Sequence, residues 1–596
     1  MSKSLYATSL RTHACGDLRK FHKGEAVTVC GAIDRVVDDR TYEVRDAYGK
    51  VLVRRAPGAG DEDFAAWRIQ RPSPETIVRA KGTVDLRKPP DPSNPTGEVM
   101  VQATGFELLA YAKEPLLFDF RDEKVPRKER IRHRYLYLRK PAVHETFAFR
   151  TKVVAALRRF LVSRGFEEVE TPILANRWTP EARESWLAIR DREQVFALPG
   201  ARPIHGTLLM ASGFDRVFEV ARRFRRKATY GPMEQPEYDV LDVTAAYVDE
   251  ADLLRLEDDI VAHVLKECGG GASPSSVRAA AYEEALVRYG TDAPDARYGL
   301  EFQDLTELGR ASRVPDVREP LHGGGALRAV LVRRGAEVVK DREIAELAKL
   351  ATGRSETAAL FWITVADDAT FSDTGTIPSD RIVAREIVKR LKAEPGDLAI
   401  AALDRDRTAL GALTAELRPR LARACGLLDR RPGGAGPGHA FFRVTRLPYF
   451  RPDPATGEPV LAGDPLVRPV AEELEAEVEP AKLHGYAHSL VLDGVEVGGG
   501  AIRNHDRQFQ NRLLQSFGIA AEDADRRFGQ LLHALRYGVP PHGRIAIGID
   551  RLVALLRGLP SLDEVIALPK TDEGLDPLTR SPWPIDNALV RSVLGL

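Results

Sequence analysis

The chain has 596 residues, which at roughly 150 residues per domain corresponds to about four domains and excludes a single small fold. Lys plus Arg and Asp plus Glu both number 87, so the formal net charge is zero and a global attraction to nucleic acid or anionic membrane is excluded. Hydrophobic residues make up 43% and charged residues 29%, which is typical of a folded protein and not of a disordered one.

The four cysteines, Cys15, Cys30, Cys268 and Cys425, lie far apart, with no CxxC pair and no histidine cluster at metal-ligand spacing. This spacing predicts reduced, mostly buried thiols and neither a disulfide framework nor a structural zinc site. The first residues lack an apolar signal-peptide core, and no window of about 18 uncharged apolar residues occurs. We therefore expect a cytoplasmic protein that does not associate with a membrane.

Residues 1–115 are expected to form a small antiparallel β-barrel. Apolar and polar residues alternate with period two in segments that begin near residues 25, 40, 75 and 97, with turn residues between them. The proline-rich segment 88–97 should form the long loop before the last strand, because proline cannot donate a backbone hydrogen bond.

The next segment, 116–143, is expected to be a hinge and contains a basic stretch from Lys124 to Lys140. Aromatic residues are interleaved with its charges. The stretch therefore fits two interpretations equally well: a solvated hinge that leads into a helix, or a hinge that faces the phosphates of a nucleic acid.

The rest of the chain is predicted to form one large domain that is interrupted by an insertion. The pattern turns helical from residue 144 to Gly165, and strands and helices alternate afterwards. Two Gly/Pro-rich breaks bracket a mixed α/β block, 276–435, which splits the large domain into the parts 144–275 and 436–596. The expected fold class is α+β, with a barrel, a catalytic domain in two pieces and an α/β insertion.

Three segments carry residues suited to binding an anionic ligand. Residues 218–242 read as two antiparallel strands with clustered arginines on the first, and residues 490–503 place a carboxylate two residues before three glycines. Residues 545–557 run from a strand through a glycine into a helix that begins with an arginine. Glycines let a ligand approach the backbone, and arginine grips carboxylate or phosphate with a planar fork. Each pattern alone is also common at bulges and solvated sheet edges.

The order and the sequences of these segments resemble those of a bacterial-type aspartyl-tRNA synthetase, a class II enzyme, over essentially the whole chain. GFEEVETPIL (165–174) is similar to class II motif 1, FEVARRFRR with QPEYDVLD (218–242) to motif 2, and IAIGIDRLVALL (545–556) to motif 3. The resemblance implies an anticodon-binding OB-fold barrel, a class II catalytic domain built on an antiparallel sheet, and the family's extra domain as the insertion. It also implies a homodimer with Pro172 at its interface.

The family adenylates an amino acid with ATP and Mg²⁺ and then transfers the acyl group to the terminal adenosine of tRNA. By resemblance, the catalytic and ATP-binding residues are Arg225 on the α-phosphate, Tyr238 stacked on adenine, Arg551 on the γ-phosphate, Gly548 beside it, and Glu496 on ATP and magnesium. The substrate-binding residues are Glu181 and Asp242 for the ammonium group, Arg503 for the side-chain carboxylate, and His205 in the substrate loop.

The chain also departs from the family at positions that touch ATP and the amino acid. These positions are Lys227 in place of a glutamate, Gly206 in place of a lysine, Gly463 and Asp464 in place of two histidines, Ser489 in place of a metal-binding aspartate, and Val240 in place of a glutamine. A lost charged hydrogen bond costs roughly 1.5–3 kcal/mol, so several such losses disfavour efficient charging of ordinary aspartate. We include Lys227 among the ATP-binding residues, as a cation that compensates for the weakened metal site.

The barrel shows similar departures. The positions that stack on the anticodon and recognise a base edge in the family correspond to Thr41 and Leu52, so we expect anticodon recognition to be weak or absent. Three hypotheses follow. The chain is a divergent paralogue that activates aspartate or an aspartate-like acid for tRNA or a small-molecule acceptor, an ordinary aspartate–tRNA ligase, or a catalytically silent homologue that binds tRNA, nucleotide or a partner protein.

Overall fold

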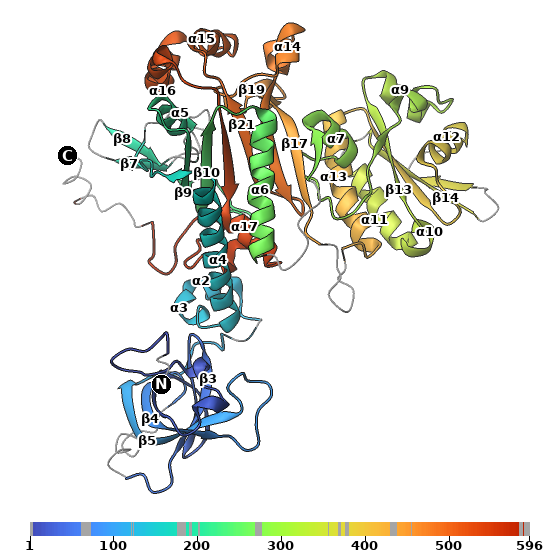
Figure 1. Ribbon diagram of the computed structural model, residues 1–596. Helices are drawn as coiled ribbons and strands as arrows, with labels where there is room; N and C mark the ends of the chain where they lie inside the picture. Colours follow the sequence, from blue (N-terminus) through green and yellow to red (C-terminus); the bar gives the residue numbers. More distant parts are fainter. Residues whose placement is uncertain are drawn as a thin grey trace. The chain divides into compact units, whose positions relative to one another are not determined.

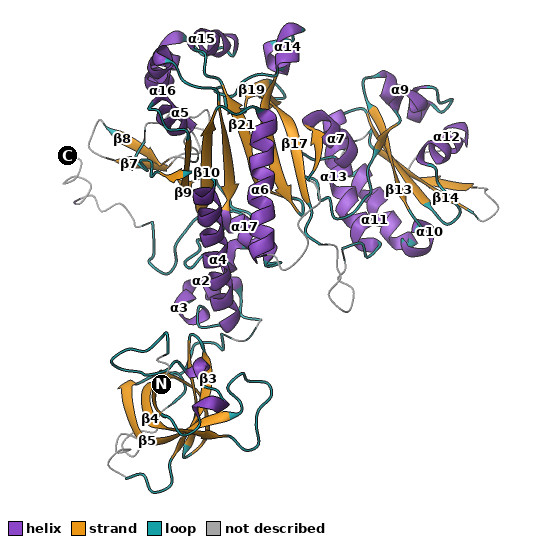
Figure 2. Ribbon diagram, viewed as in Figure 1, coloured by secondary structure: helices purple, strands orange, loops and turns teal. Residues whose placement is uncertain are grey.

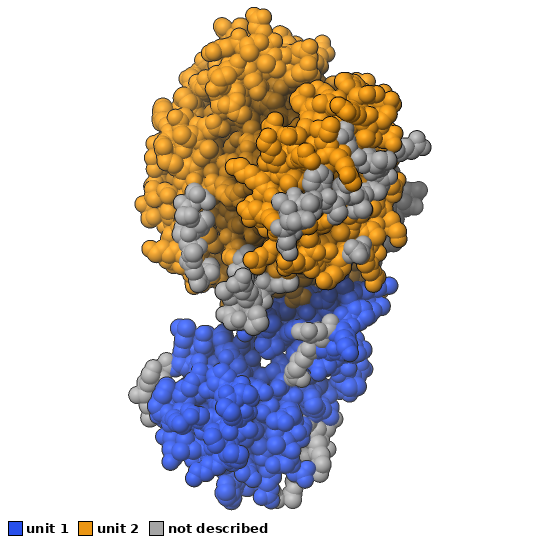
Figure 3. All heavy atoms as spheres, turned by 90° about the vertical axis from the view of Figure 1, so that its right-hand side faces the viewer, with its two compact units in different colours: residues 1–145 blue, residues 146–596 orange. Residues whose placement is uncertain are grey.

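The computed structural model describes residues 4–588 apart from 61–72, 121, 123, 176–185, 190–193, 199, 201–202, 269–276, 354, 356, 367–370, 376–380, 429–437, 454–455 and 583–587. The chain divides into two compact units, residues 1–145 and 146–596 (Figure 3). Among the described helices, none combines the length and apolar character that crossing a bilayer requires.

The first unit contains a closed five-stranded barrel, which confirms the expected OB-type fold. Its strands are β1 (Ala26–Asp38), β2 (Thr41–Asp46), β3 (Gly49–Arg55), β4 (Ile77–Leu86) and β5 (Val99–Ala110), joined in the order β1-β2-β3-β5-β4. Alternate residues such as Val27 and Val29 point into the core, as the period-two pattern predicts. The expectation of an all-antiparallel barrel is wrong, because β3 and β5 pair in parallel to close it.

The segment after the barrel forms two short helices, α2 (Arg127–Arg132) and α3 (Arg134–Tyr137). Most of its basic residues are partly or fully exposed, but the Arg134 side chain is buried and its guanidinium lies over the Tyr137 ring, 5.3 Å from the centroid. Arg139 forms an ion pair with Glu75. Part of the basic stretch is therefore structural, which neither interpretation of the sequence anticipated.

The second unit is built on a large, mostly antiparallel sheet (Figures 1 and 2). In spatial order its strands are β11 (Arg278–Ala281), β17 (Phe441–Pro448), β20 (His484–Leu492), β21 (Val495–Arg503), β22 (His542–Gly548), β10 (Glu237–Ala246), β9 (Arg216–Phe224) and β6 (Glu167–Glu168). Only the two edge strands, β11 and β6, pair in parallel among the described pairs. Strand β11 lies within the range expected for the insertion, yet it extends this sheet.

Three helices cover one face of the sheet and leave the other face for the site. They are α4 (Pro141–Ser163), α6 (Glu250–Cys268) and α17 (Ile549–Leu556); α4 and α6 cross the sheet in Figure 1. Their apolar stripes, with Leu157, Ile260 and Val553 among the fully or almost fully buried residues, pack on inward-facing residues of the central strands. This buried layer holds the strands rigidly, so the side chains on the opposite face are fixed in position.

Several smaller elements surround the open face of the sheet. They are the hairpin β7 (Trp186–Ile189) and β8 (Val195–Leu198), the helices α5 (Pro203–Ala211), α14 (Ala471–Glu475), α15 (Arg507–Ser516) and α16 (Ala521–Ala534), and the hairpin β18 (Phe450–Pro452) and β19 (Pro459–Leu461). Helices α15 and α16 follow the glycine-containing strand β21 in the chain.

The insertion forms its own five-stranded sheet with helices packed against it, which confirms its mixed α/β character. The strands are β12 (Gln303–Asp304), β13 (Ala326–Val332), β16 (Leu398–Asp404), β14 (Ala359–Val365) and β15 (Phe371–Gly375), in this spatial order and with every described pair antiparallel. Its helices are α7 (Tyr282–Tyr289), α8 (Thr306–Arg310), α9 (Pro315–His322), α10 (Gly335–Val338), α11 (Asp341–Thr352), α12 (Arg381–Leu391) and α13 (Arg407–Ala424).

Candidate active site

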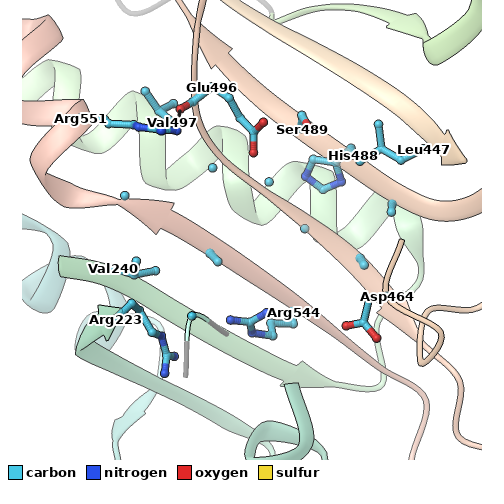
Figure 4. A pocket seen from close by; sticks show the side chains of 18 of the residues that line it. Arg223, Val240, Leu447, Asp464, His488, Ser489, Glu496, Val497, Arg544 and Arg551 are labelled. Atoms are coloured by element: carbon cyan, nitrogen blue, oxygen red, sulfur yellow. Dashed lines mark hydrogen bonds between the residues drawn. The ribbon is translucent and has the colours of Figure 1, made fainter. Parts of the chain in front are cut away.

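A cavity of about 440 Å³ opens on the face of the large sheet that the three helices leave free. Its walls come from β9, β10, β20, β21 and β22 and from the start of α17, so the structure brings together all three segments that the sequence singled out. The strand register explains the convergence: Val240 lies opposite Gly548, and Gly498 lies opposite Ile547. We call this cavity the cleft (Figure 4).

One end of the cleft holds the residues expected to bind ATP. Arg225, Tyr238, Glu496, Gly548 and Arg551 all line it. Arg551 lies in the first turn of α17, where its Nε donates to the Met233 carbonyl at 2.9 Å and its Nη1 to the Glu496 carbonyl at 2.8 Å. These two bonds fix the guanidinium, which is the preorganisation that binding of a charged phosphate requires.

Lys227 is not among the residues that line the cleft. Its Nζ pairs with Glu234 Oε1 at 2.8 Å, and Glu234 does line the cleft. Burial alone would raise the pKa of Glu234, but the bonds from Lys227 and the Gly231 amide hold it below its usual value. Direct contact between Lys227 and ATP therefore stays a prediction, and the contact that the structure gives is with Glu234.

The cleft offers one carboxylate suited to a metal ion. Glu496 lies on β21 beside Ser489 of β20 in Figure 4, and crowding by the surrounding protein raises the pKa of its carboxyl. Asp239 and Asp550, the acidic residues on the opposite wall, are instead paired with Arg150. Mg²⁺ is commonly held by one or two carboxylates together with substrate phosphates, so this donor set fits a magnesium ion that ATP brings with it.

The glycines of β21 let neighbouring backbone lie close to the floor of the cleft. A Cβ atom on Gly498 would lie 2.4 Å from the Ala546 carbonyl oxygen, and one on Gly500 would lie 2.7 Å from the Arg544 carbonyl oxygen and 2.8 Å from the His488 ring. These distances are too short for any side chain. The glycine run is therefore required by strand packing beneath the cleft, in addition to any close approach of a ligand.

A buried histidine in the wall was missed by the sequence analysis. His488 lines the cleft, and its Nε2 lies 3.0 Å from Glu257 Oε1, which comes from α6 on the covered face. Glu257 also accepts two hydrogen bonds from Arg443, at 3.1 and 2.8 Å. This chain of contacts holds the His488 ring in place. Because Glu257 is 186 residues from Arg443 and 231 from His488, no local pattern connects them.

Of the residues expected to bind the acyl substrate, Arg503 lines the other end of the cleft, whereas Asp242 lines a separate small cavity whose lining shares Arg223 with the cleft. Asp242 accepts two hydrogen bonds from Arg544, both at 2.6 Å, and a further one from Arg223. Burial alone would raise the pKa of Asp242, but the two guanidiniums hold it below its usual value. The carboxylate that we expected to hold the substrate ammonium is thus already occupied by two cations.

Arg503, expected to grip the substrate carboxylate, is paired as well. Its Nη1 donates to Asp464 Oδ2 at 2.7 Å, and Asp464 is the residue that stands in place of a family histidine. Arg223 belongs to the arginine cluster noted in the sequence but was assigned no role, and Arg544 was not identified from the sequence. The period of two along the strands points to both: Arg544 shares a strand face with Ala546 and Gly548, and Arg223 shares one with Arg225.

His205, which was also expected to bind the substrate, is not among the residues that line the cleft. Glu181 lies outside the described residues. His205 lies on α5, where it lines a separate small cavity together with Gly206 and Glu219. A Cβ on Gly206 would lie only 2.6 Å from Thr244 Oγ1, so Thr244 fills the space that a side chain at 206 would need. The stretch from Pro203 onward is helical and is not the open loop that we expected.

Comparisons with known proteins agree with this geometry. Residues 126–572 match the family model described as tRNA synthetases class II (D, K and N). The chain belongs to this family. The class II resemblance, the fold class and the expected enzyme class, a ligase of the class II aminoacyl-tRNA synthetase type, are thereby confirmed.

The chain aligns with relatives over nearly its whole length. It is 32% identical to an aspartate–tRNA ligase of Geobacillus kaustophilus over 97% of each chain, and 33% identical to an aspartate–tRNA(Asp/Asn) ligase of Thermotoga neapolitana over 98% of this chain and 99% of that one. Among solved structures, an asparaginyl-tRNA synthetase from Pyrococcus horikoshii in complex with asparaginyl-adenylate shares the fold, with a TM-score of 0.55 and 16% identity over 94% of this chain and 98% of that one.

Proposed function

We propose that the chain activates a small carboxylic acid of the aspartate class with ATP and transfers the resulting acyl group to an acceptor hydroxyl. The observation that carries this proposal is the convergence of Arg225, Arg551, Tyr238 and Glu496 in one cleft on an antiparallel sheet. Two cations at one end of a cavity, of which Arg551 is held by two hydrogen bonds, provide the electrostatic environment that phosphoryl chemistry needs.

In the first step, an oxygen of the acid's carboxylate forms a bond to the α-phosphorus of ATP. The bond from that phosphorus to the β-phosphate oxygen breaks, and its electron pair leaves with pyrophosphate. In this proposal Arg225 stabilises the charge on the α-phosphate, Arg551 holds the γ-phosphate and Tyr238 stacks on adenine. Glu496, with Ser489 beside it, would hold Mg²⁺, which supplies charge neutralisation on the phosphates.

In the second step, the oxygen of an acceptor hydroxyl attacks the acyl carbon, the bond from that carbon to the AMP oxygen breaks, and the hydroxyl proton is released. A tRNA terminus and a small-molecule acceptor fit this chemistry equally. The names of the relatives favour tRNA, whereas Thr41 and Leu52 in the barrel lack the stacking ring and amide that anticodon reading would use. We therefore propose tRNA without strong anticodon selection.

Ordinary aspartate–tRNA ligation is the second candidate function. The aspartate–tRNA ligase of Geobacillus kaustophilus aligns with this chain over 97% of its own length, and the aspartate–tRNA(Asp/Asn) ligase of Thermotoga neapolitana over 99%. Two observations speak against it. Asp242 already accepts hydrogen bonds from arginine side chains. Gly206 and Asp464, which pairs with Arg503, stand at positions where the family has other residues. The two candidates differ in the acid that is activated and share the adenylation step.

We also propose a cytoplasmic homodimer, by analogy with the family. Pro172 and its neighbours Ile173 and Leu174 are exposed on the described surface of a single chain, with Ile173 44% and Leu174 51% accessible. Exposed apolar side chains in a row are typical of an interface that a second chain covers. Sedimentation analysis of the full chain and of Leu174→Asp tests this assignment.

ATP–pyrophosphate exchange tests the adenylation step. Full-length protein should catalyse exchange with at least one acid from a panel of amino acids and dicarboxylates, and Arg225→Ala and Arg551→Ala should each lower the rate by at least 100-fold. Arg526→Ala, at an exposed site on α16, is the matched control and should retain the rate. Absence of exchange with every acid would refute the proposal in favour of a silent homologue.

A further inference from the structure

Three arginines meet three carboxylates at the acyl-substrate end of the cleft. Arg223 and Arg544 share one carboxylate, Asp242, while Arg503 and Asp464 pair one to one. The third carboxylate, Glu219, lies opposite Asp242 in the strand register, lines the same small cavity and accepts a hydrogen bond from Thr171. The charges are therefore balanced, and what this end still lacks is hydrogen-bond acceptors for its guanidinium donors.

Some of the guanidinium donors at this end have no acceptor among the described residues. The Arg223 side chain is only 1% exposed, and its Nε and Nη1 have no hydrogen-bond partner among the residues that the structure describes. The Nε of Arg503, whose side chain is 4% exposed, is in the same situation. Guanidinium groups donate and never accept, and buried donors are almost always paired. The missing partners are therefore acceptors, and both arginines line the cleft where a ligand can supply them.

Among the described residues, the carboxylates at this end that could accept from an ammonium group are already committed, and Glu181 lies outside the described residues. Asp242 accepts three hydrogen bonds, and Asp464 accepts from Arg503 and from the Leu466 amide. The described carboxylate that remains, Glu496, lies at the ATP end of the cleft, as Figure 4 shows, with Arg544 and Asp464 across from it.

We infer that the acid activated here is a small dicarboxylate without an α-ammonium group, whose second carboxylate is held by Arg223 and Arg544. Arg223 keeps two N–H donors beyond its bond to Asp242, and a ligand carboxylate supplies the acceptors that they lack. The inference rests on the proposed adenylation, because the first carboxylate still forms the bond to the α-phosphorus while pyrophosphate leaves. Succinate, which is aspartate without its amino group, is the probe.

The first test compares succinate with L-aspartate in ATP–pyrophosphate exchange by the full-length protein. We expect kcat/KM for succinate to exceed that for aspartate by at least 10-fold. In Arg544→Gln, which keeps a hydrogen-bond donor and removes the charge, the preference should fall by at least 10-fold. Arg526→Gln, on the exposed surface of α16, should keep the wild-type preference. An equal or higher kcat/KM for aspartate in the wild type would overturn the inference.

The second test separates the ligand from the chemistry. Binding of succinate and of aspartate is measured by calorimetry in the presence of α,β-methylene ATP, which cannot be cleaved at the bond that adenylation breaks. Tighter binding of succinate, lost in Arg544→Gln but not in Arg526→Gln, supports the inference even if no exchange occurs, and then only the adenylation proposal fails. Tighter binding of aspartate, or no binding of either acid, overturns the inference.

Discussion

The substitution Asp242→Asn probes the contact on which the account of the substrate end depends. Oδ2 of Asp242 accepts one hydrogen bond from Arg223 and one from Arg544, and Oδ1 accepts one from Arg544. An asparagine keeps one acceptor oxygen, so at least one bond is replaced by two opposed donors. Removing one partner of a buried ion pair costs about 3–5 kcal/mol, because the remaining charge is left uncompensated.

Calorimetry of the thermal transition of residues 146–596 measures this loss. Unfolding entropies of about 2.1 cal/mol/K per residue give roughly 0.9 kcal/mol/K for a unit of this size, so the melting temperature should fall by about 3–5 °C. The matched control is Asp259→Asn, whose pair with Arg164 is about half exposed on both sides and is worth at most about 1 kcal/mol. If both variants melt within 1 °C of the wild type, Asp242 does not hold the two arginines as described.

Three further predictions concern other parts of the molecule. Gly206→Ala should lower the free energy of unfolding by about 1–3 kcal/mol, measured by urea unfolding, because the added Cβ would contact Thr244. The same substitution in a Thr244→Ala background should cost much less. Equal costs in the two backgrounds would contradict the contact. Lys227→Glu should place a second carboxylate beside Glu234 and raise the KM for ATP in the exchange assay by at least 10-fold, and Lys227→Gln should have an intermediate effect. A lower KM for ATP in Lys227→Glu would show that the lysine does not support ATP binding. Full-length protein should bind tRNA transcripts with different anticodons within threefold of one another in filter binding, and a preference above 10-fold would restore anticodon reading by the barrel.

Much of the fold could be predicted from the sequence because strand periodicity and turn residues are local. Apolar and polar residues alternate in 25–38, and 521–534 has an amphipathic pattern. These local patterns correspond to the strand β1 and the helix α16. Strand pairing was harder to predict. The parallel contact of β3 with β5 closes the barrel between segments about 48 residues apart, and β11 joins a sheet partner more than 150 residues away. Such pairings depend on the whole topology.

The convergence of the residues expected to bind ATP could be predicted because they fall in contiguous segments. Arg225 and Tyr238 lie in 218–242 and Arg551 in 545–557, and the structure brings them into one cleft, whereas their contact with ATP stays a prediction. The substrate end could not be predicted in the same way. Whether Asp242 is available to a ligand depends on Arg544, which is 302 residues away along the chain, and on a side-chain geometry that no spacing encodes. The chemistry of that end therefore depends on which side chains are already paired.

The most direct test of this account is a competition between two acids for one activation site. Full-length protein is incubated with ATP, Mg²⁺, pyrophosphatase and equimolar succinate and L-aspartate, and the acid-quenched mixture is analysed by mass spectrometry for the two acyl-adenylates. The account predicts succinyl-adenylate in at least 10-fold excess over aspartyl-adenylate. Predominant aspartyl-adenylate would contradict it, and would show that the cleft holds an α-ammonium group in spite of Arg223 and Arg544.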